Sequence, residues 1–484
     1  NLAINNPNYN AAHANDLKIK LHLDYQFNNW QTWLRLTQGG EKMSWSHKIL
    51  FEEPNGFADA GNQQESLSQH SVGYQQITAQ THHKHTIDSE TQINTKLSWA
   101  STDAERILFD SFSAGKLPEN HREEKWFLST VFNTRPSKQH SLALGAELSY
   151  QTFGLASDAF SAASPNSFVL EEMNEWSTYS TALFSEHQWK LSENLSQFIG
   201  LRLDKDEYTG YMWSPRLAWV YGLDDGQTLK TIVSRSVRKN NAEELRKQHT
   251  EGGQESPEVI ESLEVIYQNQ LEKDQRISVN TFYNQYDVLA IDVDTLRSDV
   301  VAQLDFGGIE LEWSYHKYNW KIDASHGFTK LISFSGKSAI NQKISANGSG
   351  YGNDISQWSN NISKLAFIYD ASENLSFNSA LRVFWGYEGS QDYIDLTYDL
   401  RQSDTASSST ALTSTANYDD PTGVSAFLDL GIQYQLSSSS HLGLHGYNLL
   451  GLLDEKLNKR IYVINVGNYQ LEPTSLSLQY RHDF

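Results

Sequence analysis

The stretch SLSLQYRHDF, residues 475–484, decides the fold. Leu476, Leu478, Tyr480, His482 and Phe484 share one face of an extended chain, and the other face carries Ser, Ser, Gln, Arg and Asp. A period of two indicates a β-strand whose two faces meet different surroundings. In a membrane barrel the apolar face contacts lipid, and the polar face lines a wet lumen.

The same alternation recurs at 17–25, 142–150 and 426–434. These segments run to about ten residues, which is the length that a tilted strand needs to cross a bilayer. Strands of soluble proteins are usually about five or six residues long. The pattern therefore predicts an all-β fold, a transmembrane antiparallel β-barrel.

Connections of two kinds separate the predicted strands. Short polar turns, such as 27–29 and 272–274, alternate with long polar stretches. The long stretches are 39–67, 101–123, 151–174, 238–257, 330–357, 388–422 and 450–472. Outer-membrane barrels have short periplasmic turns and long external loops, so we expect a periplasmic C-terminus.

The predicted strands number about 19. They are 16–26, 29–38, 68–83, 90–100, 124–134, 138–151, 175–190, 194–206, 213–222, 226–237, 258–271, 275–288, 306–317, 318–329, 358–369, 372–387, 423–436, 440–450 and 473–484. A single-chain bacterial barrel has an even number of strands. We therefore expect a barrel of about 19–22 strands, in which either the first few strands lie upstream of Asn1 or the count of 19 is wrong by one.

Composition supports a barrel and excludes several other classes. Only 38% of the residues are hydrophobic, yet aromatic residues reach 12%, as half-buried strands with aromatic girdles require. A formal charge of −21 argues against nucleic acid as a partner. The chain has no cysteine, which excludes disulfides and thiolate chemistry. A soluble propeller would show a repeat of about 40–50 residues, and we find none.

Several segments resemble the barrel of TonB-dependent receptors. Residues 214–245 resemble the family's strand–turn–strand with its S-P-R-L opening, although Asn240 and Asn241 stand where the family often has proline. The segments 255–264, 278–288, 307–315, 448–450 and 476–484 resemble later elements of the family, in the same order.

This resemblance implies a 22-stranded receptor barrel in the bacterial outer membrane. Its cargo would be a scarce, bulky nutrient such as an iron chelate, cobalamin or an oligosaccharide. The family's plug and energy-coupling segment have no counterpart in the sequence, and the segment before Asp16 resembles an outer loop several strands into a barrel. We therefore expect residues 1–484 to form a single barrel domain. Coupling to TonB would use a plug outside this chain.

Candidate ligand-binding residues fall in two groups. Arg235, Arg238, Glu243 and Glu244 lie in the family-like segment, where they either contact cargo at the lumen mouth or form cross-strand ion pairs that order the wall. The second group consists of aromatic residues expected in outer loops, whose rings could stack on sugars or flat chelates: Trp45, Tyr351, Tyr393 and Tyr398.

The metal-binding candidates are weaker. His82, His83 and His85 could bind a metal, but a polar strand end at the periplasmic rim is the favoured interpretation. Asp204, Asp206 and Glu207 match no complete calcium loop, so a solvated acidic loop is favoured there, as it is for Asp292, Asp294 and Asp299. In some haem receptors of the family a ligand histidine follows residues like 214–245, and His249 is the nearest candidate, although the supporting motif is broken.

Other aromatic residues are expected at the two interfaces between membrane and water. We expect eight tryptophans in the girdles, namely Trp176, Trp189, Trp213, Trp219, Trp313, Trp320, Trp358 and Trp385. We find no catalytic motif and expect neither enzymatic activity nor a cofactor.

The favoured function is that of a receptor-transporter embedded in outer-membrane lipid and lipopolysaccharide. The alternative is a plugless passive pore, or a structural barrel that anchors a surface assembly.

Overall fold

A computed structural model describes most of the chain. The described residues are 17–47, 66–109, 116–159, 175–240, 245–246, 249, 256–291, 298–336, 359–386, 424–454, 457, 459–462, 468–471 and 474–482. The long strands, in chain order, are β1 (Ile19–Phe27), β2 (Trp30–His47), β3 (Ser66–Thr86), β4 (Thr91–Phe109), β5 (Lys116–Ser137), β6 (His140–Leu155), β7 (Trp176–Lys190), β8 (Leu195–Asp206), β9 (Tyr211–Asp224), β10 (Gln227–Arg238), β11 (Glu258–Glu272), β12 (Gln275–Ile291), β13 (Ser298–Lys317), β14 (Trp320–Gly336), β15 (Asn361–Ser372), β16 (Leu375–Trp385), β17 (Val424–Ser437), β18 (Ser440–Tyr447) and β21 (Ser475–His482).

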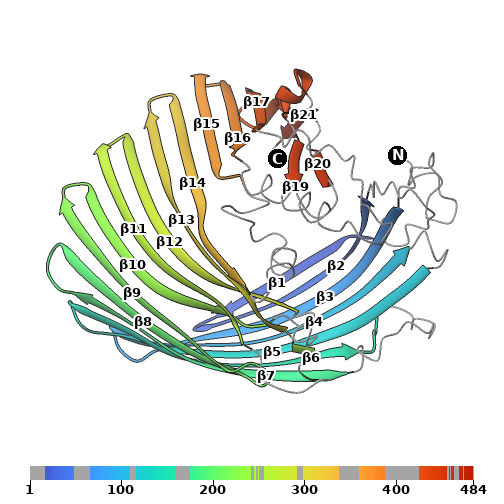
Figure 1. Ribbon diagram of the computed structural model, residues 1–484, viewed down its shortest axis with the longest axis vertical. Coiled ribbons are helices and arrows are strands. Elements are labelled where there is room, and N and C mark those ends of the chain that lie inside the picture. The colour runs from blue at the N-terminus through green and yellow to red at the C-terminus, as the bar shows by residue number, and fades with distance from the viewer. Residues whose placement is uncertain are drawn as a thin grey trace, which may run out of the picture.

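These 19 strands form one antiparallel sheet that curves into a wall (Figure 1). Each strand pairs with the next along the chain, and β18 pairs with β21. Within the described residues β1 pairs only with β2, and β21 only with β18, so these two strands are the edges of the wall. A separate hairpin, β19 (Lys459–Tyr462) and β20 (Asn468–Leu471), follows a short 3₁₀ turn at Leu449–Leu452.

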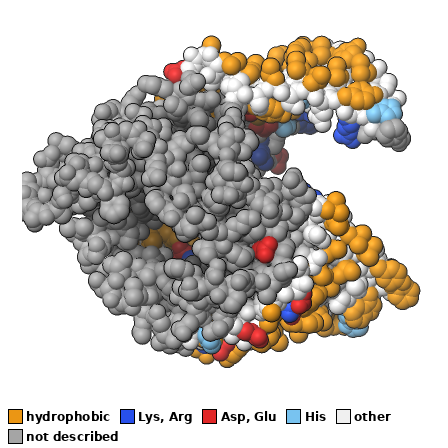
Figure 2. All heavy atoms as spheres, turned by 90° about the vertical axis from the view of Figure 1, so that its right-hand side faces the viewer, with side chains coloured by type: hydrophobic (Ala, Val, Ile, Leu, Met, Phe, Trp, Pro, Cys, Tyr) orange, Lys and Arg blue, Asp and Glu red, His pale blue; other side chains and the backbone are white. Residues whose placement is uncertain are grey.

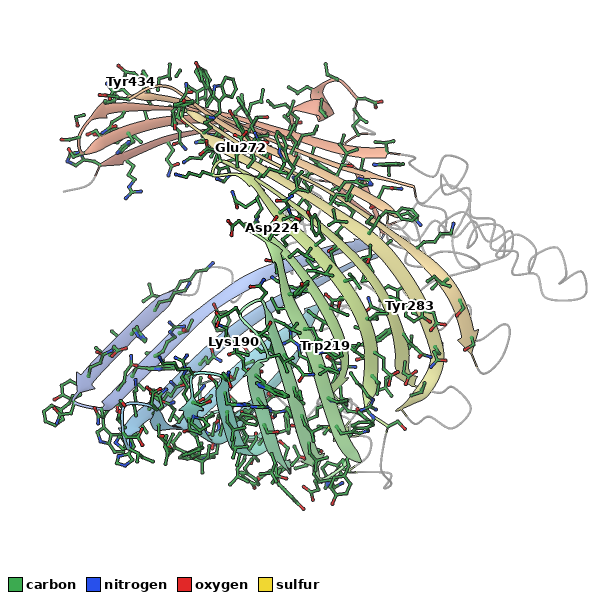
Figure 3. The ribbon with its side chains drawn as sticks, turned by 90° about the vertical axis from the view of Figure 1, so that its left-hand side faces the viewer. Lys190, Trp219, Asp224, Glu272, Tyr283 and Tyr434 are labelled. Atoms are coloured by element: carbon green, nitrogen blue, oxygen red, sulfur yellow. The ribbon has the colours of Figure 1, made fainter. Side chains whose placement is uncertain are left out.

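Tight connections gather at one end of the wall, called here the short-turn end, and the opposite end is called the loop end. Asn28 adopts a left-handed conformation (φ 49°) between β1 and β2, and Gly226 (φ 83°) does so between β9 and β10. A side chain at Gly226 would be strained because L residues rarely adopt positive φ. Lys190, Asp224 and Glu272 mark the short-turn end in Figure 3, and Tyr283 lies toward the loop end.

The outer face of the wall carries an apolar band between two aromatic belts. On β7, Tyr179 and Trp189 point outward and are 54% and 39% exposed, with Leu183 between them at 64%. Ten residues at ~3.3 Å each, tilted by ~40°, give a height of roughly 25 Å, which matches the apolar band of membrane barrels. Hydrophobic side chains cover the outside of the wall in Figure 2, while charged ones appear within its curve.

Each predicted strand overlaps one strand of the sheet, and the terminal segment forms β21 with the expected two faces. Two expectations about loops were wrong. Strands β2 to β5 extend into 39–47, 66–67, 101–109 and 116–123, and the stretch 450–472 contains β19 and β20. Alternation is lost in the extended parts of the strands, because both faces of a hairpin that rises above the bilayer are wet.

Within the described residues, no helix is long and apolar enough to cross a bilayer.

A buried carboxylate near the loop end joins two strands and the segment that follows a third. Asp206 is completely buried and accepts hydrogen bonds from the Thr178 hydroxyl at 3.4 Å and from the Tyr208 amide at 3.0 Å. The Lys239 ammonium lies 2.5 Å from its other oxygen. Burial of a charge is tolerated only when it is paired and hydrogen-bonded, so this cluster fixes β7, β8 and the segment after β10 relative to one another.

Replacement of Asp206 by Asn should lower the free energy of unfolding by about 1–3 kcal/mol, because Lys239 and Thr178 lose their charged partner. Urea titration of the protein in lipid vesicles would measure the change. Asp224→Asn, at an exposed turn, is the matched control and should change the value by less than about 0.5 kcal/mol. Equal effects of the two variants would refute the structural role of Asp206.

The two faces should also respond differently to charge. Leu311 points outward at mid-band and is 42% exposed, whereas its neighbour Glu312 points inward. Leu311→Arg should destabilise the membrane-inserted protein by about 2–4 kcal/mol, and Glu312→Arg should change stability by much less. Urea unfolding in vesicles compares the pair, and the reverse order of the two effects would contradict the assignment of the faces.

Candidate ligand site on the inner wall

A recess of about 440 Å³ lies on the inner face of β5 to β8, toward the loop end. Its charged lining comes from Lys125 on β5, Glu147 on β6, Arg202 and Asp204 on β8, and Lys239 after β10. Each strand residue alternates with an outward apolar one, so the strand register brings these side chains to one place.

Arg202 is the centre of this charge cluster. Its Nη2 lies 2.7 Å from Glu147 Oε2 and 2.7 Å from Asp204 Oδ1, and its Nε donates to Asp204 Oδ2 at 2.9 Å. The guanidinium carbon also lies 5.5 Å from the centre of the Phe184 ring. Charge-assisted hydrogen bonds to two carboxylates hold the guanidinium in place.

Phe184 lies flat against the wall because its neighbour is a glycine. A Cβ built on Gly145 would come within 2.1 Å of the Phe184 ring, so only glycine permits this position of the ring. The ring in turn supports Arg202. The sequence thus places a glycine, an aromatic ring and an arginine on three adjacent strands.

An aromatic cluster borders the recess at its loop end. The Trp176 and Phe153 rings stack with centroids 4.4 Å apart, and both side chains are buried. Leu245, 2% exposed, packs against them. Tyr208 meets Trp176 edge-on at 6.1 Å, and the His249 ring stacks on Trp176 at 5.9 Å.

Tyr208 orients the His249 ring. The Tyr208 hydroxyl lies 2.8 Å from His249 Nδ1 and 3.3 Å from the Ser177 carbonyl oxygen. Burial raises the pKa of the Tyr208 phenol, which therefore keeps its proton. Both contacts are satisfied when that proton goes to Ser177 and His249 donates Nδ1–H. The His249 side chain is exposed, so one face of its ring is open to a ligand.

Recess and cluster together offer ring surfaces beside charged groups. Aromatic rings bind flat or aromatic groups by stacking. Lys125 is the cation of this lining that has no hydrogen-bond or ion-pair partner within the described residues, so its charge is available to a ligand. Among those same residues, no group of three metal-ligating side chains could hold an ion.

The two predicted arginines both form cross-strand ion pairs. Arg235 points outward, lies against the Trp213 ring at 5.1 Å and pairs with Glu261 at 3.5 Å. Arg238 pairs with Glu258, its partner in the β10–β11 register. This arrangement matches the wall-ordering alternative and places neither arginine in the recess.

The other predicted ligand-binding residues cannot be placed. Glu243, Glu244, Tyr351, Tyr393 and Tyr398 lie outside the described residues. Position 45 belongs to strand β2 rather than to a loop, and the Trp45 side chain is not described.

Two sequence interpretations were wrong. Trp176 was expected in an outer girdle, but it is 7% exposed and stacks in the aromatic cluster. Asp204 and Asp206 were expected in a solvated acidic loop, but Asp204 pairs with Arg202 and Asp206 is buried beside Lys239. The alternation already placed Glu147 inward, yet no local signal connects it with Arg202, 55 residues away.

The histidines of β3 do belong to a strand end. His83 and His85 share the outer face, where the His83 ring stacks on Trp30 at 4.2 Å. Trp189, Trp213, Trp313, Trp320 and Trp385 are exposed on that face, as expected for girdle residues. Trp358, Asp292 and Asp294 lie outside the described residues, and the Asp299 side chain is not described.

Solved structures with the same fold are receptors and transporters. The siderophore receptor PirA from Acinetobacter baumannii aligns with a TM-score of 0.65 at 14% identity, over 96% of this chain and 70% of that one. The ferric-catecholate import receptor Fiu from E. coli aligns with a TM-score of 0.62 at 11% sequence identity, over 96% of this chain and 74% of that one. The FrpB iron transporter from Neisseria meningitidis aligns with a TM-score of 0.58 at 11% sequence identity, over 96% of this chain and 78% of that one.

No curated protein matches the chain. The family description "TonB dependent receptor-like, beta-barrel" matches residues 8–449. That span exceeds half of the sequence and includes most strands of the wall. The chain therefore belongs to the TonB-dependent receptor family, whose β-barrels lie in the outer membrane and serve transport.

Proposed function

We propose that this chain is the barrel of an uptake receptor for an iron chelate that carries aromatic rings and negative charge. The carrying observation is the aromatic cluster of Trp176, Tyr208 and His249 beside the charged recess. The exposed His249 ring, held by Trp176 and Tyr208, supplies a stacking surface, and Lys125 supplies a cation that has no ion-pair partner within the described residues. The printed cargo of the similar PirA and Fiu structures, siderophores and ferric catecholates, supports this choice over cobalamin and oligosaccharides.

The orientation of the wall follows from this proposal. Cargo would enter at the loop end, where the aromatic cluster lies, so that end would face the medium. The short-turn end and the C-terminal strand β21 would then face the periplasm. Energy would reach the barrel through TonB acting on a plug that these residues do not supply.

The outer face offers contacts to lipopolysaccharide. Lys205 lies 5.5 Å from the centre of the Tyr211 ring, and Arg235 lies against Trp213, so both cations accompany the aromatic belt of the loop end. Cations beside an interfacial belt are suited to phosphate headgroups. We assign them to lipid contact rather than to cargo.

His249→Ala should weaken binding of a ferric tris-catecholate complex about tenfold, because it removes the exposed ring of the cluster and with it stacking worth roughly 1.4 kcal/mol. Equilibrium dialysis of the purified full chain in detergent, with radioactive iron, measures the dissociation constant. Trp313→Ala, on the outer face, is the matched control and should leave it unchanged. A wild-type chain that shows no saturable binding would favour the passive pore instead.

Lys125→Gln tests the charge of the cargo. We expect about fivefold weaker binding of the same anionic complex, corresponding to the ~1 kcal/mol of one partly exposed ion pair. The affinity should also depend less on salt, because screening acts on the lost pair. Lys230→Gln, on the inner face of β10 and away from the recess, serves as control. Equal losses in both variants would point to the general lumen field rather than to a site.

A further inference from the structure

Two histidine rings meet on the outer face of the wall, near the short-turn end. His140 is the first residue of β6, and His187 lies three residues before the end of β7. His140 Nδ1 lies 3.0 Å from His187 Nε2, and the two ring planes are within 4° of parallel. Both side chains are half-buried, so part of each ring is accessible to solvent.

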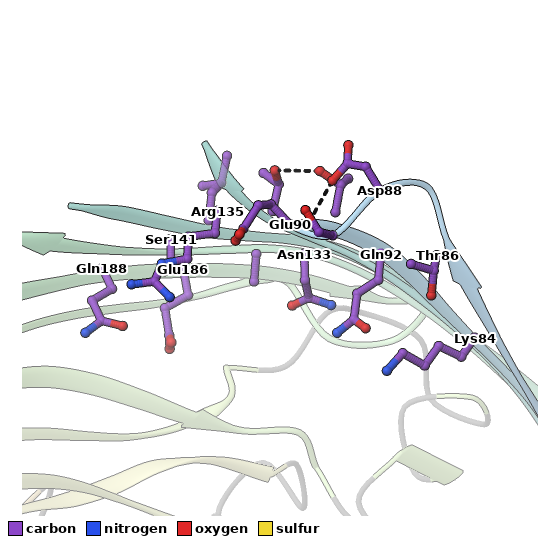
Figure 4. A pocket seen from close by; sticks show the side chains of 15 residues that line it. Lys84, Thr86, Asp88, Glu90, Gln92, Asn133, Arg135, Ser141, Glu186 and Gln188 are labelled. Carbon is purple, nitrogen blue, oxygen red and sulfur yellow. Dashed lines mark hydrogen bonds between the residues drawn. The ribbon is translucent and has the colours of Figure 1, made fainter. Parts of the chain in front are cut away.

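The alternation along β6 and β7 places both rings on the lipid side of the sheet. Their sequence neighbours Ser141, Glu186 and Gln188 line a recess on the inner face (Figure 4). Because successive residues of a strand point to opposite faces, His140 and His187 point away from the lumen. The sheet therefore separates this pair from the recess that we assign to cargo.

The neighbours of the pair in the sheet are uncharged. The His140 ring stacks on Trp189, its partner in the β6–β7 register, with ring centroids 5.6 Å apart. In the described strands no charged residue lies directly opposite either histidine, since the partners in register are Ser137, Trp189, Leu142 and Ile199. The two facing nitrogens thus meet each other rather than a carboxylate or an ammonium group.

Two facing imidazole nitrogens are suited to a metal ion. In the hydrogen-bonded pair one nitrogen carries a proton and the other accepts it. An ion bound at ~2.0–2.1 Å to each of two imidazole nitrogens, with a tetrahedral angle, holds them about 3.3 Å apart. The observed separation of 3.0 Å is close to that distance, so a small rotation of the rings makes room for the ion. The bridging proton then moves to the far nitrogen of its own ring, and both facing lone pairs bind the metal.

The ligand type limits the choice of ion. Imidazole suits Zn²⁺, Cu²⁺ and Ni²⁺, whereas Mg²⁺ and Ca²⁺ prefer oxygen ligands. Within the described residues no third His, Cys, Asp or Glu side chain joins the two histidines in a metal-binding group. Water therefore completes the coordination, as it does in zinc sites that keep an open position.

We propose that His140 and His187 form a binding site for a divalent transition-metal ion such as Zn²⁺, bound through His140 Nδ1 and His187 Nε2. The ion links β6 to β7 on the outer face near the short-turn rim. It stabilises the folded wall, because the unfolded chain does not hold the two rings together. The site is independent of the proposed cargo, which binds on the other side of the sheet.

Urea unfolding of the full chain in lipid vesicles, with zinc chloride or with EDTA, tests the proposal. Zinc at about 100 times its dissociation constant should raise the folding equilibrium constant of wild type about 100-fold. His140→Phe and His187→Phe should each lose this zinc response, and both keep an aromatic ring at the position. His441→Phe, on β18, is the matched control and should respond like wild type.

The zinc response distinguishes a metal site from a hydrogen-bonded pair, whose loss would lower stability equally with zinc and with EDTA. Equal zinc responses of all four proteins would overturn the proposal, as would a wild type that does not respond.

Electron paramagnetic resonance of wild type with one equivalent of Cu²⁺ gives a second readout that needs no variant to fold. We expect coupling of the copper to two imidazole nitrogens, and coupling to fewer than two would contradict the site. No iron chelate is present in either experiment, so a negative result here leaves the test of the cargo site unchanged.

Discussion

The backbone amides of this chain have one constraint from which the rest of the structure follows. Inside a bilayer no water can satisfy an N–H or C=O group, so every strand must find its partners in neighbouring strands. The antiparallel ladders from β1 to β18 and on to β21 meet this requirement for every strand between the two edges of the wall. Both edge strands run from the loop end to the short-turn end. An antiparallel seam between them therefore needs an odd number of intervening strands.

The same ladders decide where side-chain chemistry can occur. Because successive residues point to opposite faces, every second residue of a strand faces lipid, and these positions are occupied by Leu, Tyr and Trp. The inner face is left with the polar half of each strand, and there charges meet across strands. The strand register, as well as the sequence, brings the paired charges together. The pairs are Arg202 with Glu147 and Asp204, and Asp206 with Lys239.

Sequence periodicity was sufficient for the strands and for the two faces, because lipid imposes a pattern that can be recognised locally. Leu476, Leu478 and Tyr480 lie on one face of β21 for that reason. Strand ends beyond the bilayer have no such pattern, and β2 to β5 were predicted too short. Of the two alternatives for the family-like segment, the structure shows the cross-strand ion pairs of Arg235 and Arg238, and contact with cargo stays a prediction.

The candidate site was beyond sequence reasoning for a different physical reason. Glu147 and Arg202 are 55 residues apart, and Trp176 and His249 are 73 positions apart in the numbering. These contacts depend on the register between neighbouring strands of the wall and on the position of the segment after β10, which contains His249. Trp176 was assigned to a girdle because it is a tryptophan, although the alternation along β7 places it on the inner face with Ser180 and opposite to Trp189.

Pairing is what separates wall from site on the inner face. A charge matched across neighbouring strands, such as Arg238 with Glu258, stabilises the sheet and has little capacity left for a ligand. A charge without a partner can give its full interaction to a ligand. Until the ligand binds, water must solvate that charge. Within the part of the chain that the structure describes, Lys125 near the loop end is of this second kind. Because the other charged groups that line the loop-end recess are matched by ion pairs, Lys125 sets the charge that a passing molecule meets there.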